Sequence, residues 1–134
     1  MHHVGGLSIL WRCAVAGAAI VAPPASENST GWIVSATPNA PTHASMVPTQ
    51  LQHVLAAGGR PAHLKEVLLG GASIPIELLQ HAANQGWPVR TSYGMTETAS
   101  MICLSSRWTT EDVNRASHSR TDAPARSEEH TSEL

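Results

Sequence analysis

Two short stretches of the chain combine residue types that could bind a magnesium nucleotide. The stretch Ser92-Tyr93-Gly94-Met95-Thr96-Glu97 places an aromatic ring, a small residue, a hydroxyl and a carboxylate within one turn. Tyr93 could stack on a base, the Thr96 hydroxyl and nearby amides could hold a phosphate, and Glu97 offers the hard oxygen that Mg²⁺ prefers. The stretch Gly70-Gly71-Ala72 would let the main chain approach a flat ring or a phosphate without obstruction by a Cβ atom. By itself, a Tyr-Gly turn after a strand is commonly just a turn.

Both stretches are predicted to follow buried strands of an α/β fold with a parallel sheet. Short apolar runs alternate with amphipathic segments, which start at proline and stop at glycine. The pattern predicts helices over 6–16, from Pro48 to the glycine at 58, and from Pro75 to Gly86, and strands over 18–22, 42–47, 64–69 and 89–93. Ser73 is expected to cap the helix that Pro75 starts. In such sheets ligands bind beyond the carboxyl ends of the strands, where both stretches fall.

The remaining segments are expected to contribute little to the core. Residues 24–41 are rich in Pro, Ser, Asn and Thr and predict a loop, whereas residues 105–125 are polar and without periodicity and predict irregular structure. Residues 126–134 resemble the translated read-through of a sequencing-library adapter and are set aside from the fold. Near the N-terminus Arg12 interrupts an apolar run, which argues against a secretion signal and a membrane span.

Composition excludes several classes of function. The formal net charge is −2, without a basic patch for nucleic acid. Cys13 and Cys103 form no Cys-x-x-Cys pair, so neither a zinc site nor a disulfide framework is indicated, and a reduced cytoplasmic setting is expected. The histidines lack metal-binding spacing and are expected at the surface, and the tryptophans are expected to pack. These are His43, His53, His63 and His81, and Trp11, Trp32, Trp87 and Trp108.

Taken together, the motifs resemble those of the adenylate-forming superfamily, which includes acyl-CoA synthetases, luciferases and peptide-synthetase adenylation domains. Tyr93 to Glu97 is similar to that family's Tyr-Gly-x-Thr-Glu signature, and Gly70 to Ala72 matches its adenine-binding Gly-Gly-Ala. His3 to Leu7 resembles a further motif at the nucleotide and acyl pocket. Within the superfamily, several stretches are most similar to the o-succinylbenzoate-CoA ligases. These stretches are 3–12, 42–51, 64–79 and 86–100.

The resemblance implies roles for individual residues. Tyr93 would stack on adenine, the backbones of Gly70, Gly71 and Ala72 would line the adenine and acyl pocket, and Ser92, Gly94 and Met95 belong to the same cofactor-binding set. Thr96 would contact the α-phosphate, Glu97 would hold Mg²⁺, and His3 would border the acyl and phosphate site. The implied reaction uses ATP, Mg²⁺, CoA and a small-molecule carboxylate. The carboxylate attacks the α-phosphorus of ATP to give acyl-AMP and pyrophosphate, and the CoA thiol then displaces AMP.

The resemblance covers residues 1–103 as part of an AMP-binding domain, and the chain departs from the family pattern at 24–41 and from Leu104 onward. The family's upstream phosphate loop, ribose-binding Asp and catalytic Lys have no counterpart here, so the chain is expected to be an internal fragment that is inactive alone. Another acyl-CoA ligase for a fatty or aromatic acid, or an inert nucleotide-binding fragment, remains an alternative. Whether the parent forms homo-oligomers is left open.

Overall fold

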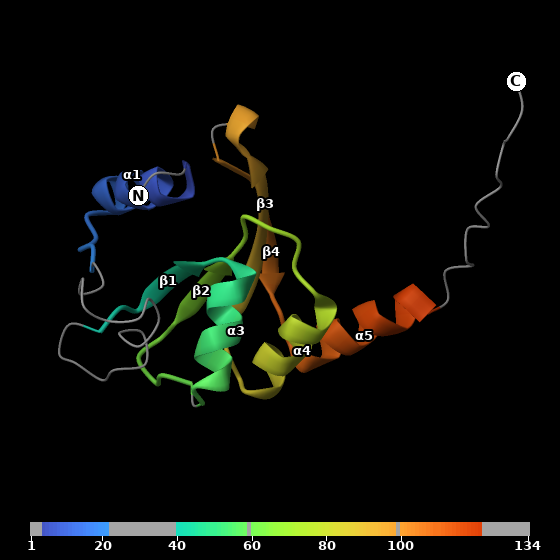
Figure 1. Ribbon diagram of the computed structural model, residues 1–134. Coiled ribbons are helices and arrows are strands. Elements are labelled where there is room, and N and C mark those ends of the chain that lie inside the picture. Colours follow the sequence, from blue (N-terminus) through green and yellow to red (C-terminus); the bar gives the residue numbers. More distant parts are fainter. Residues whose placement is uncertain (1–3, 22–39, 59, 99, 122–134) are drawn as a thin grey trace, which may run out of the picture.

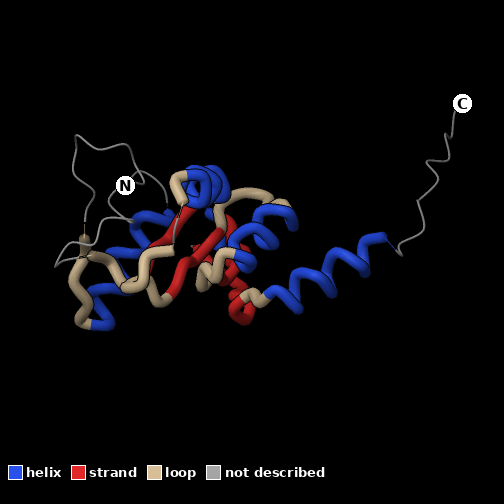
Figure 2. Tube along the Cα trace, turned by 90° about the horizontal axis from the view of Figure 1, so that it is seen from below, coloured by secondary structure: helices blue, strands red, loops and turns tan. Residues whose placement is uncertain are grey.

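The computed structural model describes residues 4–21, 40–58, 60–98 and 100–121 and shows alternating strands and helices followed by a strand hairpin (Figures 1 and 2). The helices are α1 (Val4–Ala16), α3 (Pro48–Ala56), α4 (Ile76–Asn84) and α5 (Thr110–Thr121), with a single 3₁₀ turn, η1 (Thr96–Thr98). The strands are β1 (His43–Met46), β2 (Glu66–Leu69), β3 (Val89–Met95) and β4 (Ser100–Arg107).

The four strands form one mixed sheet in the order β1-β2-β3-β4. β1, β2 and β3 run parallel, with Leu69 paired to Met46 on one side and to Thr91 on the other. This parallel part confirms the expected α/β class. β4 differs, because it returns antiparallel to β3 through the short η1 turn and pairs Tyr93 with Cys103. The carboxyl end of β2 therefore lies beside Thr91 in the middle of β3, and β3 continues to Met95 and the η1 turn.

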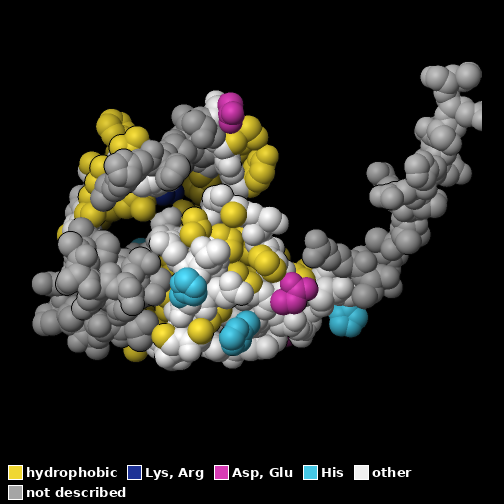
Figure 3. All heavy atoms as spheres, viewed as in Figure 1, with side chains coloured by type: hydrophobic (Ala, Val, Ile, Leu, Met, Phe, Trp, Pro, Cys, Tyr) yellow, Lys and Arg dark blue, Asp and Glu magenta, His cyan; other side chains and the backbone are white. Residues whose placement is uncertain are grey.

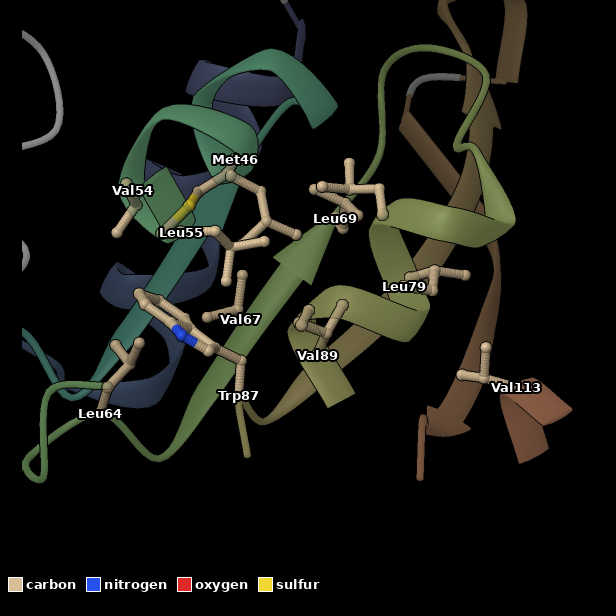
Figure 4. Packing of buried hydrophobic residues seen from close by; sticks show 13 residues of the cluster. Met46, Val54, Leu55, Leu64, Val67, Leu69, Leu79, Trp87, Val89 and Val113 are labelled. Carbon is tan, nitrogen blue, oxygen red and sulfur yellow. The ribbon is translucent and has the colours of Figure 1, made fainter. Parts of the chain in front are cut away.

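One hydrophobic cluster joins the parallel strands to α3, α4 and the start of α5 (Figure 4). Its members are Met46, Leu51, Val54, Leu55, Leu64, Val67, Leu69, Leu78, Leu79, Ala82, Trp87, Val89 and Val113. Alternate residues of β2 are buried, as expected for a strand covered on one face by helices. Removing this apolar surface from water is the main stabilising contribution, at roughly 25 cal/mol per Å². The sheet is thus held as a base for the turns at its carboxyl edge.

Prolines and glycines set the helix ends largely as predicted. α3 begins at Pro48, and the Val47 amide donates to Gln50 Oε1 at 3.0 Å. α4 ends at Asn84 and is followed by a left-handed Gly86, whose amide donates to the Ala83 carbonyl at 2.9 Å. The prediction for Ser73 is wrong, because the cap position of α4 is Pro75 and makes no side-chain capping bond. Proline already has the extended φ of a cap residue, so no serine is required there.

Two expectations about the ends of the chain are wrong. Residues 18–21 form no strand, and the tail of that expected strand, like most of the loop expected over 24–41, lies outside the described residues. Residues 105–121 are ordered as the end of β4 and as α5, not irregular. Val113 is the one buried residue of α5 among those whose side chains are described, and the residues around it are half-buried or exposed. A helix with so narrow an apolar face has no clear hydrophobic period.

α1 contributes nothing to the hydrophobic cluster and carries an exposed apolar surface (Figure 3). Trp11 is 75% exposed, so its predicted packing role is wrong, whereas Trp87 is buried and Trp108 half-buried. Trp32 lies outside the described residues. His43, His53 and His81 are exposed as expected, and His63 is half-buried. Among the described helices, none is both long and apolar enough to cross a membrane.

A reciprocal cap at the start of α5 gives a first testable expectation. The Thr109 hydroxyl and amide donate to Asp112 Oδ2 at 2.7 and 3.1 Å, and these bonds lower the pKa of the Asp112 carboxyl. A lowered pKa in the folded state means that the carboxylate stabilises the fold above its unfolded pKa. That contribution is lost as the pH falls through the folded pKa.

Replacing Thr109 by Ala is therefore expected to raise the pKa of Asp112 toward its ordinary value, since the larger of the two hydrogen bonds is removed. An NMR titration of the Asp112 carboxyl carbon measures this directly. The exposed neighbour Thr110 provides the control, because Thr110→Ala leaves both bonds in place. An unchanged Asp112 pKa in Thr109→Ala would contradict the capping interpretation.

Candidate nucleotide-binding site

The candidate site is a groove at the carboxyl edge of the sheet, between the turn after β2 and the β3–β4 hairpin. It has a volume of about 470 Å³. We call it the site groove, and its lining residues are Ala72, Ser73, Ile74, Thr91, Ser92, Tyr93, Cys103, Leu104 and Ser105. Parallel pairing of β2 with β3 brings the two sequence motifs together here, because Leu69 and Thr91 are register partners. Figure 1 shows the loop after β2 passing beside β3 before it enters α4.

The two glycines of the turn after β2 are required for different reasons. Gly71 has a φ of 82°, in the left-handed region that side chains disfavour, and a Cβ there would lie 3.4 Å from Val47 Cγ1. Gly70 has no positive φ, but a Cβ on it would overlap the Ser92 hydroxyl oxygen. Its amide donates to the Met46 carbonyl of β1 at 3.2 Å. The turn is therefore packed closely against both neighbouring strands.

β3 is fixed by side-chain hydrogen bonds just before Tyr93. The Thr91 amide donates to Ser105 Oγ at 2.9 Å, at a point where the register of β3 against β4 shifts. Trp108 Nε1 donates to Thr91 Oγ1 at 3.1 Å. On the other side of the strand, Ser92 Oγ donates to the Leu69 carbonyl at 3.3 Å. These bonds satisfy polar groups that the irregular ladder would otherwise leave unpaired.

Tyr93 presents an accessible aromatic face to the groove. It is 61% exposed, although it lies within a paired strand, and its cross-strand partner is the exposed Cys103. An aromatic ring that is fixed by its backbone and uncovered on its face can stack on a nucleobase at little cost in conformational entropy. This role was predicted for Tyr93 from the sequence, and the structure leaves its ring free of the hydrophobic cluster.

The turn after β3 carries the hydroxyl and the carboxylate of the motif. Thr98 Oγ1 accepts from the Met95 amide at 3.3 Å and donates to the Met95 carbonyl at 2.9 Å, which closes the η1 turn. Glu97 is exposed on this turn, following Gly94 and Met95 at the end of β3. Thr96 opens η1, and its side chain lies outside what the structure describes.

A magnesium ion brought in by a nucleotide is compatible with these residues. The part of the chain that the structure describes contains no group of three His, Cys, Asp or Glu side chains able to hold a metal. Mg²⁺ in nucleotide sites is commonly held by one or two carboxylates together with substrate phosphates and water. The Glu97 carboxylate is exposed on η1, at the end of the strand that carries Tyr93, and is a ligand of this type.

The structure brings only some of the residues predicted for the site into the groove. Ala72, Ser92 and Tyr93 line the groove, Gly70 and Gly71 form the turn beside it, and Glu97 lies on η1 at the end of the same strand as Tyr93. His3 lies outside the described residues. Several further contributors were not predicted from the sequence. They are Ser73, Ile74, Thr91, Cys103, Leu104 and Ser105, which line the groove, and Thr98, which closes η1.

Three of those omissions had a signal in the sequence. Thr98 follows Glu97 by one residue, and a hydroxyl within a polar turn commonly bonds to nearby backbone. Cys103 and Ser105 follow the motif closely enough to face it if the chain turns back in a short hairpin and pairs as an antiparallel strand. The chain was expected to leave the family pattern from Leu104 and to be irregular over 105–125, so this return was not predicted.

Comparison with known proteins identifies the family. The family model of AMP-binding enzymes matches residues 1–127, and the chain belongs to that family. The 2-succinylbenzoate–CoA ligase of Salmonella typhimurium is 40% identical over 116 residues, which are 84% of this chain and 23% of that protein. The 2-succinylbenzoate–CoA ligase of Staphylococcus epidermidis is 32% identical over 108 residues, 79% of this chain and 22% of that protein. The expected resemblance to these ligases is confirmed.

Solved structures agree with the sequence relatives. The o-succinylbenzoate CoA synthetase of Bacillus subtilis in complex with the acyl-adenylate intermediate OSB-AMP superposes with a TM-score of 0.71 at 30% identity, over 84% of this chain and 23% of that one. The complex of the same synthetase with ATP and magnesium ion gives 0.67 at 31% identity, over 81% and 22%. The chain thus spans less than a quarter of the length of the relatives it matches.

Proposed function

We propose that this chain forms the adenine- and phosphate-binding part of an ATP-dependent acid–thiol ligase. The observation that carries the proposal is that the Gly70–Ala72 turn after β2 meets Tyr93 of β3 in one groove, on the strand that leads into Thr96 and Glu97 of η1. The relatives named 2-succinylbenzoate–CoA ligase support o-succinylbenzoate as the carboxylate and CoA as the thiol. The cytoplasm is the proposed location, in keeping with two cysteines that are both free thiols.

The proposed reaction has two steps. A carboxylate oxygen attacks the α-phosphorus of ATP, pyrophosphate leaves, and the acyl-AMP retains the mixed anhydride bond. The CoA thiol then attacks the acyl carbon, AMP leaves with the electron pair of the broken C–O bond, and the thiol proton passes to solvent. Such transfers depend mainly on positioning and on stabilising charge, which are the tasks of a binding edge rather than of a covalent nucleophile.

Each part of the motif has a task in this proposal. Tyr93 stacks on the adenine, and the backbone of the Gly70–Ala72 turn borders the ring on the other side of the site groove. Thr96 contacts the α-phosphate. Glu97 is the proposed Mg²⁺ ligand, and the bound ion would offset negative charge on the phosphates. His3 is proposed to border the acyl and phosphate site.

Cys103 offers a direct test of nucleotide binding by this chain. Its exposed thiol lines the site groove opposite Tyr93, so bound ATP should shield it from alkylation. At a concentration of ATP with Mg²⁺ ten times the Kd, the free site falls about tenfold, and the alkylation rate of Cys103 is expected to fall by a similar factor. Peptide mass spectrometry after timed iodoacetamide treatment measures the rate.

The second cysteine is a control within the same molecule. Cys13 is half-buried on α1 and is not part of the groove, so its alkylation rate should not respond to ATP. Inorganic triphosphate with Mg²⁺ should protect less than ATP, because it has no base to stack on Tyr93. Equal protection of both cysteines, or none at Cys103, would contradict nucleotide binding in this groove.

A further inference from the structure

The Ser92 side chain makes a hydrogen bond within the protein, although Ser92 belongs to the motif expected to bind nucleotide. Its hydroxyl donates to the carbonyl of Leu69 at 3.3 Å, and Leu69 is the last residue of β2. The bond therefore joins β3 to the point where the chain leaves the sheet. From there the chain enters the Gly70–Ala72 turn directly, so the bond acts on the start of the turn.

Gly70 fits against that hydroxyl because it has no side chain. A Cβ built on Gly70 would overlap Ser92 Oγ and would lie 3.2 Å from the Ser92 carbonyl oxygen and 3.6 Å from Ser92 Cβ. Its φ lies outside the left-handed region, so backbone conformation does not demand glycine at this position. The need for glycine arises from the closeness of Ser92. If the Ser92 hydroxyl oxygen were removed, a Cβ on residue 70 would have one remaining tight contact, the 3.2 Å approach to the Ser92 carbonyl oxygen.

The rest of β3 is fixed independently of this contact. Thr91 is bonded to Ser105 from β4 and to the indole of Trp108. The position of Tyr93 is therefore set mainly from the β4 side, whereas the Gly70 turn is set from the β2 side. Ser92 is the side chain that links the two.

We propose that Ser92 is a positioning residue, whose hydroxyl, seated against Gly70, sets the separation between the Gly70–Ala72 turn and the Tyr93 ring. This proposal rests on the proposed function, because that separation is the width available to the base. Ser92 then acts on nucleotide through the turn and does not need to touch the ligand. The contact with Ser92 also explains why Gly70 and Gly71 are not equivalent. Gly70 is needed because a side chain would overlap Ser92, whereas Gly71 is needed for its positive φ.

A double-mutant cycle on the 134-residue chain tests this pairing. Gly70→Ala is expected to weaken ATP binding roughly twentyfold and Ser92→Ala roughly fivefold, because each disturbs the turn. If the two residues act as one unit, the double variant should bind about as well as Ser92→Ala alone, not a hundredfold more weakly. Ser92→Thr keeps the donor and should stay within about threefold of the unmodified chain. Chemical-shift titration with ATP and Mg²⁺ gives each Kd.

Matched substitutions control for the chemistry of the change. Ser106→Ala removes an exposed hydroxyl from β4 that does not line the site groove. Gly5→Ala adds a Cβ where nothing lies within 4 Å. Neither variant should change the Kd for ATP. The proposal would be overturned if the Kd changes of Gly70→Ala and Ser92→Ala multiplied in the double variant. It would also be overturned if Ser92→Ala bound ATP normally.

A measurement without ligand separates this proposal from the proposed function. The Gly70 amide is bonded to the Met46 carbonyl, so its hydrogen exchange reports whether the turn stays seated. Faster Gly70 exchange in both single variants, with no further increase in the double variant, supports the unit. If that pattern appears but no variant binds ATP, the nucleotide function fails while the contact stands. If ATP binds and the exchange is unaffected, the proposed positioning by Ser92 fails alone.

Discussion

Replacing Glu97 by Gln in a ligase that contains this chain is expected to lower kcat for adenylation by roughly 10² or more, the scale of losing one preorganised electrostatic stabiliser. Gln keeps the size of the side chain and removes its charge. The Glu97 side chain is exposed on η1 and makes no hydrogen bond to another described residue, so the substitution should leave the fold unaffected. The rate of o-succinylbenzoate-dependent exchange between pyrophosphate and ATP measures the effect at saturating Mg²⁺.

A second acidic position separates a local effect from a change in overall charge. Glu111 is equally an exposed carboxylate, but it lies on α5, which does not contribute to the site groove. Glu111→Gln should therefore leave the exchange rate unchanged. The KM for ATP in Glu97→Gln should rise less than kcat falls, because in the proposed site the base is held by Tyr93 and the Gly70–Ala72 turn. Near-normal turnover of Glu97→Gln at saturating Mg²⁺ would remove the metal role from this residue.

The parallel half of the fold could be predicted from local signals. The apolar run before Gly70 falls at β2, the run from Val89 to Tyr93 falls at β3, and the proline and glycine positions mark the ends of α3 and α4. Both kinds of signal are local: hydrophobic periodicity indicates the strands and helices, and the restricted backbone angles of proline and glycine mark where they end. The prediction that two motifs would meet at one sheet edge followed from parallel pairing and the short helical crossover between them.

The antiparallel return and α5 could not be predicted in the same way. β4 is an edge strand in which the apolar residues Met101, Ile102 and Leu104 are exposed, so its sequence lacks the alternation of buried apolar and exposed polar residues. Its place in the sheet comes from pairing with β3, which is a tertiary contact. α5 has one buried core residue, Val113, and only the Thr109–Asp112 capping box marks its start. That box is visible in the sequence but is a weak signal without a hydrophobic stripe behind it.

Within the site, residue types could be predicted, whereas their partners could not. Tyr93 and Glu97 were expected in a nucleotide site because of their chemistry. The bond from Ser92 to Leu69 and the bond from the Thr91 amide to Ser105 join residues far apart in the chain. Such bonds depend on strand register, and the register of β3 against β4 shifts at just this point. A pattern of residue types along one strand contains no information about such a shift.

Stability of the whole arrangement should depend most on Trp87, which is 2% exposed and is the largest fully buried side chain in the described structure. Figure 4 shows its indole beneath Val67 and beside Leu64, at the end of the sheet opposite the site groove. Truncation to Ala leaves a large cavity that the packed strands cannot close, so Trp87→Ala is expected to cost about 3–5 kcal/mol of unfolding free energy. Urea denaturation followed by far-UV circular dichroism measures this loss.

Two further variants decide whether the loss reflects packing. Trp87→Phe keeps most of the ring and removes an indole N–H that has no hydrogen-bond partner among the described residues, so it should cost much less than Trp87→Ala. Trp11→Ala removes an indole that is 75% exposed on α1 and should change stability by no more than about 0.5 kcal/mol. A Trp87→Ala chain as stable as Trp11→Ala would mean that the cluster under β2 and β3 does not hold the sheet. The turns at its carboxyl edge would then lack the rigid base on which their proposed role depends.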